Sequence, residues 1–347
     1  MSQWVQALRR ISAGGQDAVL VTIASGKGST PREAGAKMVV TPDAIQGTIG
    51  GGDVEYQAIE IARDMLRETG GKRSKRFPLG ASLGQYCGGV ANLVFELVPA
   101  RANWVGQLEE WLDSGATCIL VTLATAGAGD ERLFVRASDF SGSLGDAAHD
   151  AAALVFARRL LADPNRAVTV APVAEGVEAL FEPVEPARFN VVLFGAGHVG
   201  RALARVLGTL AVRVTWVDGR ANEFPRDIPD NVRAVVTDTP LKEVAAAPPG
   251  AWFLVMTHSH ALDLDLVESI LRRPDIAFCG MIGSDTKRRT FENGLAKRGL
   301  DAAALARFTC PIGIAALTGK DPGTIAVAVA AQLLEQMEGL AARTPAL

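Results

Sequence analysis

The sequence has no long hydrophobic run. None of its apolar stretches reaches the ~18–20 uninterrupted residues that cross a membrane. The first twelve residues, MSQWVQALRRIS, predict an amphipathic helix and lack the apolar core and small-residue cleavage site of a signal peptide. We therefore expect a cytoplasmic protein that has no membrane partner.

Cysteine, aromatic residues and excess charge are also scarce. The four cysteines (Cys87, Cys118, Cys279 and Cys310) form no CxxC pair, which excludes a zinc ribbon and predicts reduced thiols. Aromatic residues make up 6% of the chain, and the formal net charge of −3 lacks the basic excess of a general nucleic-acid binder. We expect no nucleic-acid partner.

The abundant residues are aliphatic side chains and glycine. Hydrophobic residues make up 48% of the 347 positions, and 36 are glycine, a mixture typical of α/β proteins with more than one domain. Two prolines in FEPVEPARFN (181–190) precede a buried strand and mark the clearest boundary. We predict an N-terminal α/β domain (1–187), a Rossmann-like, doubly wound parallel-sheet domain (188–337) and a tail (338–347).

The N-terminal domain contains an internal duplication. VLVTIAS (19–25) matches ILVTLAT (119–125), the segment 47–66 matches 142–161, and GVANLVFELVPA (89–100) matches GVEALFEPVEPA (176–187). Three matches in the same order predict two related α/β halves, at about 18–100 and 117–187, which we expect to share one sheet.

Only the first half carries the features typical of ligand binding. LGQYCGG (83–89) surrounds Cys87 with glycine and polar residues, where the second half has VAEGV. A structural cysteine normally lies in an apolar strand, as Cys118 and Cys279 do, so Cys87 is a candidate ligand-binding thiol. A small residue tolerated in a turn is the alternative.

Two further loops of the first half are rich in glycine. SGKGSTPREAGAK (25–37) resembles an anion-binding loop, although a mobile hairpin loop explains it equally well. GTIGGGDVE (47–55) places three glycines before a helix with Asp53 as a possible N-cap, which favours close approach of a ligand over a tight turn. The candidate residues in these loops are Lys27, Ser29, Thr30, Arg32, Gly50, Gly51 and Gly52.

GAGHVG (195–200) follows the strand NVVLF and opens a helix, with Asp218 at the end of the next strand. This is the G-x-G-x-x-G arrangement of dinucleotide-binding folds. Gly195 permits the tight turn, Gly197 the approach of a phosphate and Gly200 helix–strand packing, while Asp218 is placed to bind a ribose hydroxyl. Packing alone could also require these glycines. The predicted ligand is a nucleotide, and His198 belongs to the same turn.

Polar residues end two later strands of this domain. MTHSHALDLDL (256–266) carries His258 and His260, which suit a polar ligand pocket better than a metal site. GMIGSDTKRRTF (280–291) places Ser284 and Lys287 at the start of a helix, where they bind phosphate or form solvated helix surface.

Together, GKGSTPREAGAKMVV, GTIGGGDVE, LGQYCGG, LFGAGHVGRALA, THSHALDLDL and GMIGSDTKRRTF resemble the xanthine dehydrogenase accessory proteins, the XdhC/CoxI-type maturation factors. The resemblance covers nearly the whole chain. It implies a non-enzymatic chaperone that binds the molybdenum cofactor (molybdopterin), holds it while a terminal sulfur replaces an oxo ligand, and inserts it into apo-xanthine dehydrogenase.

The implied partners are the molybdenum-binding subunit of xanthine dehydrogenase and a cysteine desulfurase, and we expect a homodimer. The resemblance places Gln85, Cys87, Gly88 and Gly89 at the cofactor, with Cys87 as the candidate molybdenum ligand. Tyr86 stands where members often have a second cysteine, so a thiol role rests on Cys87 alone. Asp53 stands where the carbon monoxide dehydrogenase branch tends to have cysteine, which favours the xanthine dehydrogenase branch. An NAD(P)-dependent oxidoreductase built on GAGHVG is the alternative function.

Overall fold

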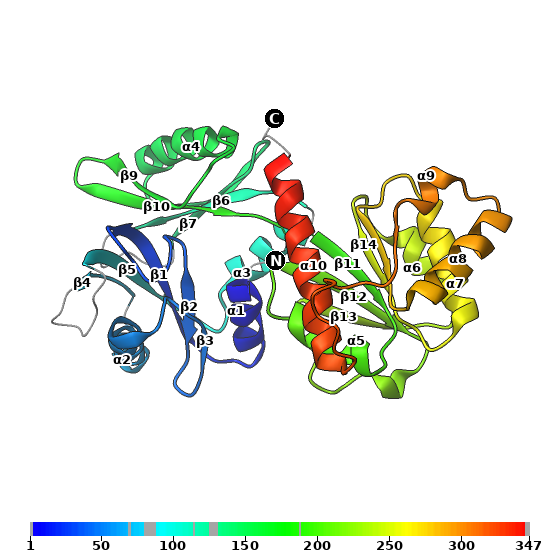
Figure 1. Cartoon of the computed structure of the whole chain (residues 1–347). Coiled ribbons are helices and arrows are strands. Elements are labelled where there is room, and N and C mark those ends of the chain that lie inside the picture. The colour runs from blue at the N-terminus through cyan, green and yellow to red at the C-terminus, as the bar shows by residue number, and fades with distance from the viewer. Residues whose placement is uncertain are drawn as a thin grey trace. The chain divides into compact units, whose positions relative to one another are not determined.

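The computed structural model describes residues 3–68, 71–79, 88–113, 115–124, 131–186 and 189–343. The chain divides into two compact units, Met1–Pro186 and Ala187–Leu347 (Figure 1). The first unit carries antiparallel sheets and the second a parallel one, which confirms the predicted fold class. No helix within the described ranges is long and apolar enough to cross a membrane.

The first unit consists of two halves with the same order of elements. The first half contains α1 (Gln3–Ala13), β1 (Ala18–Lys27), β2 (Lys37–Val40), β3 (Ile45–Gly47), α2 (Gly52–Glu68), β4 (Lys72–Leu79) and β5 (Gly89–Val98). The second contains α3 (Asn103–Asp113), β6 (Cys118–Leu123), β7 (Arg132–Val135), β8 (Phe140–Ser143), α4 (Ala147–Ala162), β9 (Thr169–Ala174) and β10 (Val177–Val184). Their sheets have the orders β3-β2-β1-β5-β4 and β8-β7-β6-β10-β9.

The expectation of one shared sheet was wrong, because the two halves form separate sheets. Each strand alternates its side chains between two faces. One face of each sheet packs on its own helix, α2 in the first half and α4 in the second. The other faces of both sheets contribute to a common hydrophobic cluster with α1 and α3. The halves are therefore joined through buried faces rather than through paired strand edges.

Two reciprocal ion pairs connect the halves. Lys37 in β2 lies 2.5 Å from Glu182 in β10, and Arg132 in β7 lies 3.0 Å from Glu96 in β5. All four side chains are at most 5% exposed. Each half thus supplies one cation and one carboxylate to equivalent positions of the other.

The surroundings of these pairs repeat as well. The Lys37 ammonium lies 5.0 Å from the ring centroid of Trp4, and the Arg132 guanidinium 4.1 Å from that of Trp104. Lys72 breaks the symmetry, because it adds a second cation 3.0 Å from Glu96. Burial raises the pKa of Glu182, whereas at Glu96 the charges of Arg132, Lys72 and Lys37 outweigh burial and lower the pKa to about 2.

The second unit is a parallel six-stranded sheet in the order β13-β12-β11-β14-β15-β16, the arrangement of a doubly wound dinucleotide-binding fold. Its strands are β11 (Phe189–Phe194), β12 (Val212–Asp218), β13 (Val232–Val236), β14 (Trp252–Val255), β15 (Phe278–Met281) and β16 (Phe308–Thr309). Its helices are α5 (His198–Leu207), α6 (Leu241–Ala246), α7 (His260–Leu271), α8 (Asp285–Lys297), α9 (Ala302–Leu305) and α10 (Pro322–Arg343), with the 3₁₀ turn η2 (Ala221–Glu223).

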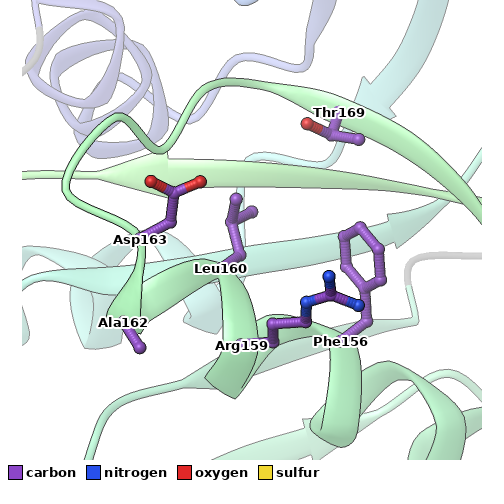
Figure 2. A pocket seen from close by; sticks show the side chains of 6 residues that line it. All are labelled: Phe156, Arg159, Leu160, Ala162, Asp163 and Thr169. Atoms are coloured by element: carbon purple, nitrogen blue, oxygen red, sulfur yellow. The ribbon is translucent and has the colours of Figure 1, made fainter.

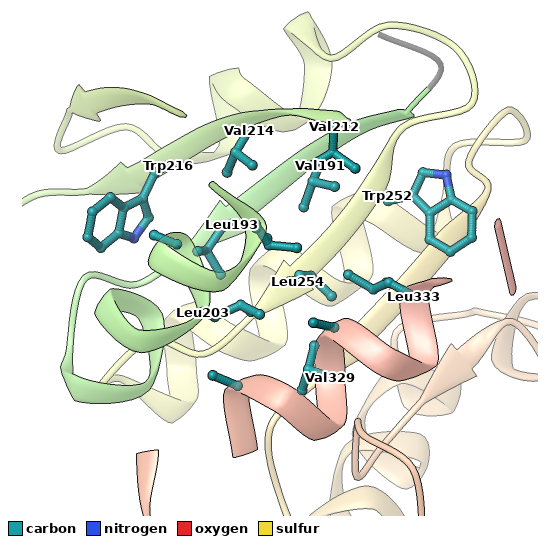
Figure 3. Close-up of a cluster of buried hydrophobic side chains, with 14 of the residues drawn as sticks. Val191, Leu193, Leu203, Val212, Val214, Trp216, Trp252, Leu254, Val329 and Leu333 are labelled. Atoms are coloured by element: carbon teal, nitrogen blue, oxygen red, sulfur yellow. The ribbon is translucent and has the colours of Figure 1, made fainter. Parts of the chain in front are cut away.

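Helices cover both faces of this sheet. Side chains of α5 and α10 pack on one face, around Leu193, Trp252 and Leu254 (Figure 3). Residues of α6, α7 and α8 pack on the other. The carboxyl ends of β11 and β14 are adjacent at the point where the strand order reverses. Ligands bind at such a point in open α/β sheets, because the loops there diverge to opposite faces.

Candidate functional site

In the first unit, the loop after β1 packs against the start of β5. Ser29 forms a bridge with Gly88. A Cβ added to Gly89 would lie 2.3 Å from the Ser29 carbonyl oxygen and 2.8 Å from that of Lys27. The residue at position 89 must therefore be glycine for the two segments to touch. Gly88 has a φ of +63°, and a Cβ there would have no heavy atom of the described residues within 4 Å.

The same loop also contacts the glycine turn before α2. A Cβ added to Gly50 would lie 2.3 Å from the Cβ of Pro31. The structure thus brings together three stretches that are distant in sequence: the loop of residues 26–33, the turn of residues 48–52 and the glycines at positions 88 and 89. The region where these three stretches meet is the candidate site of the first unit.

A carboxylate of the protein itself binds the backbone of the glycine turn before α2. Gly50, Gly51 and Gly52 all have positive φ values, and the Glu55 carboxylate accepts hydrogen bonds from the backbone N–H groups of Ile49 and Gly51. These bonds, together with one from Thr48, outweigh burial and lower the pKa of Glu55. The side chain that serves the turn is therefore Glu55, whereas Asp53 lies within the first turn of α2.

The second half repeats this turn without the run of glycines. The Asp150 carboxylate accepts hydrogen bonds from the Leu144 N–H and the Ser143 hydroxyl, and the Gly145 N–H donates to Ser143. A carboxylate on the first turn of the helix is thus part of the scaffold in both halves. The extra glycines of the first half remain candidates for ligand contact. The sequence signal that could have identified Glu55 is the acid at the equivalent position of the second half, Asp150.

The charged side chains of the first site differ in availability. Arg32 forms an ion pair with Glu33 at 2.9 Å, and the Thr30 hydroxyl donates to the Arg32 carbonyl. Lys27 is exposed and forms no ion pair with any residue of the described ranges. Gln85 and Cys87 lie outside the described residues. The predicted burial of Cys118 and Cys279 is confirmed, and burial raises the pKa of both thiols to about 12.

A cavity of about 520 Å³ lies in the second half, between the end of α4 and β9 (Figure 2). Phe156 and Leu160 form its apolar side, and Phe156 packs on Phe181 with 4.4 Å between ring centroids. Asp163 accepts a hydrogen bond from the Asn165 N–H, so it serves the local turn. None of the described residues that line this cavity belongs to the three converging stretches of the first half.

In the second unit, two of the three signature glycines are required by packing. Gly195 has a φ of +110°, and a Cβ there would lie 2.3 Å from the Met256 carbonyl oxygen. A Cβ at Gly200 would lie 2.0 Å from the Gly195 carbonyl oxygen. Gly197 differs: its φ is −68°, and a Cβ would have no heavy atom within 4 Å among those of the structure. Packing thus explains Gly195 and Gly200, whereas no described neighbour requires glycine at Gly197, the N-cap of α5.

Asp218 ends β12 and is bound to the glycine turn. Its carboxylate accepts a hydrogen bond from the Ala196 N–H at 2.7 Å and pairs with the guanidinium of Arg220 at 2.9 Å. Burial opposes ionisation of Asp218, but these hydrogen bonds outweigh it and lower the pKa to about 2. Asp218 is therefore an anion in the folded protein, and Arg220 is a residue that the sequence pattern did not reveal.

A cavity of about 140 Å³ opens beside this pair at the carboxyl ends of β11, β12, β13 and β14. The side chains and backbone around it are Phe194, Gly195, Val217, Asp218, Gly219, Arg220, Thr237, Asp238, Pro240, Thr257, His258 and Leu262. Asp218 and His258, which were predicted separately, therefore line one pocket. Thr237 and Asp238, like Arg220, were not predicted.

The remaining predicted residues of this unit lie at the same edge of the sheet. His198, His258 and His260 are exposed, and the described ranges contain no group of three side chains suited to a metal ion. Ser284 caps α8 by accepting the Lys287 N–H. The Lys287 ammonium pairs with the fully buried Asp263 at 2.8 Å, so it is already engaged within the fold.

Asp263 also accepts hydrogen bonds from the hydroxyl and the N–H of Thr257. One buried carboxylate thus connects α8 to the loop after β14, and the Thr257 backbone beside the cavity is held by it. Asp263 lies in the first turn of α7 and acts as a positioning residue at this edge of the sheet. Asp265 is exposed and pairs with Arg298.

Comparison with known proteins gives two family matches. Residues 191–333 match a family described as the XdhC Rossmann domain, and residues 11–77 match the XdhC and CoxI family. The protein YqeB of Escherichia coli strain K12, described as uncharacterized, is 27% identical over 174 residues, which are 49% of this chain. The match spans only 31% of that protein's length.

A solved structure described as a xanthine dehydrogenase from Bacillus halodurans has a similar fold, with a TM-score of 0.70 and 21% identity. The match covers 98% of this chain and 96% of the other. The likeness therefore extends over both units.

Proposed function

The chain belongs to the XdhC and CoxI family, and we propose from this membership that it is an accessory protein in the maturation of xanthine dehydrogenase. In this role it binds the molybdenum cofactor, holds it during sulfuration and inserts it into the apo-enzyme. Its partners are the molybdenum-binding subunit of xanthine dehydrogenase and a cysteine desulfurase. It forms a homodimer, and it serves as a chaperone rather than as an enzyme.

The convergence of the three glycine-containing stretches in the first unit is the observation that carries the cofactor assignment. The cofactor would bring a phosphate-bearing pterin and a metal centre with sulfur ligands. Lys27 supplies a cation at the meeting point that pairs with no carboxylate of the described ranges. No heavy atom of the described residues lies within 4 Å of a Cβ added to Gly51 or Gly88, which leaves backbone there accessible to a planar ligand. The chain's residues therefore suit such a group, with Cys87, which directly precedes Gly88 in the sequence, as the soft ligand.

Cofactor retention tests this proposal. Protein purified from cells that make the cofactor is expected to carry about one pterin and one molybdenum per chain, measured by pterin fluorescence and metal analysis. Cys87→Ala is expected to lose most of both, because a thiolate is the preferred protein ligand of a soft metal–sulfur centre. Cys118→Ala is the matched control, since its buried thiol stays protonated.

Absence of pterin from the wild-type protein would overturn the cofactor assignment. Full retention and full activation of apo-xanthine dehydrogenase by Cys87→Ala would remove Cys87 from the site while leaving the rest of the proposal in place.

Two basic residues of the same loop give an internal comparison. Lys27→Ala is expected to weaken cofactor retention about tenfold, because it removes a charge-assisted contact with the phosphate. Arg32→Ala is expected to weaken retention less, since Glu33 already offsets the Arg32 charge. Equilibrium dialysis against the isolated cofactor measures both, and thermal unfolding should be nearly unchanged because both side chains are exposed. A larger loss for Arg32→Ala than for Lys27→Ala would contradict the assignment of the phosphate to Lys27.

A further inference from the structure

The pocket of the second unit has a lining that suits a flat, partly apolar group. Val217, Pro240 and Leu262 supply apolar surface, and polar groups stand at its rim. It lies next to the amino end of α5, where free N–H groups favour a phosphate. Among the described residues, no heavy atom lies within 4 Å of a Cβ added to Gly197, so there is room for a ligand beside this turn. The pocket and the turn together suit a nucleotide.

The Asp218 carboxylate has no acceptor capacity left for a ribose. Oδ1 accepts the N–H of Arg220 at 2.9 Å and its Nε at 3.0 Å. Oδ2 accepts the Ala196 N–H at 2.7 Å and the Arg220 Nη2 at 2.9 Å. An ionised carboxylate offers about four lone-pair positions, and all four are used. The usual recognition of a free 2′-hydroxyl by an acid at this place in the fold is thus blocked by the protein itself.

The Arg220 side chain, which occupies the Asp218 carboxylate, has further N–H groups that do not bind Asp218. The Arg220 side chain is 40% exposed and lines the pocket, and only two of its five N–H groups point to Asp218. Its third nitrogen, Nη1, lies 3.5 Å from Glu223, a long contact. Glu223 in turn pairs with Arg201. The guanidinium is held in place by Asp218, lines the pocket and has further N–H groups that do not bind Asp218.

Asp238 adds an acceptor at the same pocket. It is exposed and follows β13, and its carboxylate forms no ion pair within the described ranges. A carboxylate accepts hydrogen bonds from an exocyclic amino group, such as that of adenine, while a guanidinium stacks on an aromatic ring and binds phosphate with two parallel hydrogen bonds. The two side chains therefore suit different parts of one adenosine.

We propose that this pocket binds the adenosine end of a dinucleotide and that Arg220 selects a ribose carrying a 2′-phosphate over one with a free 2′-hydroxyl. Arginine near the end of the second strand accommodates this phosphate in folds of this order. The proposal concerns the second unit alone and does not depend on cofactor binding by the first.

Titration of the full-length protein with NADPH and with NADH, followed by nicotinamide fluorescence, tests the selection. NADPH is expected to bind about tenfold or more tightly than NADH, the factor expected for charge-assisted hydrogen bonds to a phosphate. Arg220→Ala should abolish this preference by weakening NADPH binding and, because Asp218 regains free acceptors, by leaving NADH binding equal or tighter. Arg233→Ala, an exposed arginine near the amino end of β13, is the matched control and should retain the preference.

A competition experiment on the wild-type protein makes the test independent of how the variants fold. Adenosine 2′,5′-bisphosphate should displace NADPH, and adenosine 5′-monophosphate should do so about tenfold less well or worse. Equal binding of NADPH and NADH, tighter binding of NADH, or binding of neither would overturn the proposal, as would an unchanged preference in Arg220→Ala. These titrations use no molybdenum cofactor, so their failure leaves the proposed maturation role untouched.

Discussion

Glu96→Gln is expected to lower the free energy of unfolding by about 3–5 kcal/mol, the usual effect of removing one partner of a buried ion pair. Arg132 and Lys72 both lie 3.0 Å from the Glu96 carboxylate, and none of the three side chains is more than 3% exposed. Without the carboxylate, Arg132 and Lys72 would stay buried and lose the negative charge that lies 3.0 Å from each of them. Urea unfolding followed by circular dichroism measures the loss.

Glu60→Gln is the matched control, because Glu60 is half exposed and pairs with Arg63 only at 3.5 Å. Its effect should be below about 1 kcal/mol, as for other surface pairs. A loss at Glu96 as small as that at Glu60 would mean that the interior relaxes enough to solvate the two cations.

The same substitution has a defined pH dependence. The pKa of Glu96 is lowered from 4.5 to about 2 in the folded protein. A group with a depressed folded pKa contributes stability that is complete above its unfolded pKa and is lost as the pH falls through the folded one. The difference in stability between the wild type and Glu96→Gln should therefore be constant above about pH 4.5 and shrink between pH 4.5 and 2. A difference that stays constant over that range would contradict the assignment.

The second large effect is expected at the glycine turn of the second unit. Gly200→Ala places a methyl group 2.0 Å from the Gly195 carbonyl oxygen, and the backbone must move to admit it. We expect a loss of about 3 kcal/mol or more, the upper range for overpacking. Gly195→Ala adds the strain of a φ of +110° to a similar clash and should be at least as severe.

Gly197→Ala is the informative control, because the added methyl group meets no neighbouring atom. Its unfolding free energy should fall by about 1 kcal/mol or less, because alanine is a poorer N-cap than glycine and no clash is added. Nucleotide binding should nevertheless weaken, since the methyl group stands where a phosphate approaches α5. Thermal unfolding and NADPH titration of the three variants separate the two roles. Equal stability losses at Gly195, Gly197 and Gly200 would show that the turn is held by constraints other than these contacts.

The fold class could be read from the sequence because it depends on local patterns. Strands such as NVVLF and AWFLVMT are short apolar runs, and each is followed by turn residues and a helical period. Such patterns require no knowledge of distant residues. The glycine turn and Asp218 are likewise recognised from their spacing along the chain. The recurrence of whole segments likewise indicated the two halves of the first unit.

Register and pairing between distant residues could not be read in this way. The last matching segments align at 89–100 and 176–187 in sequence, which would set Glu96 against Pro183. In the structure Glu96 pairs across from Leu20, and Glu182 pairs across from Leu120, so the equivalent of Glu96 is Glu182. A shift of one residue exchanges the two faces of a strand. The sequence match therefore concealed the reciprocal ion pairs, and only the strand pairing revealed them.

The sequence by itself determined where strands, helices and glycine turns form, since hydrophobic period and backbone freedom are properties of neighbouring residues. Tertiary structure alone decided that the two halves pack through a buried layer that contains reciprocal ion pairs, that Arg220 occupies acceptors of Asp218, and that the Glu55 carboxylate binds the backbone of the glycine turn. Each of these depends on where a long side chain ends in space. That position follows from packing among segments distant in the chain, which no local pattern encodes.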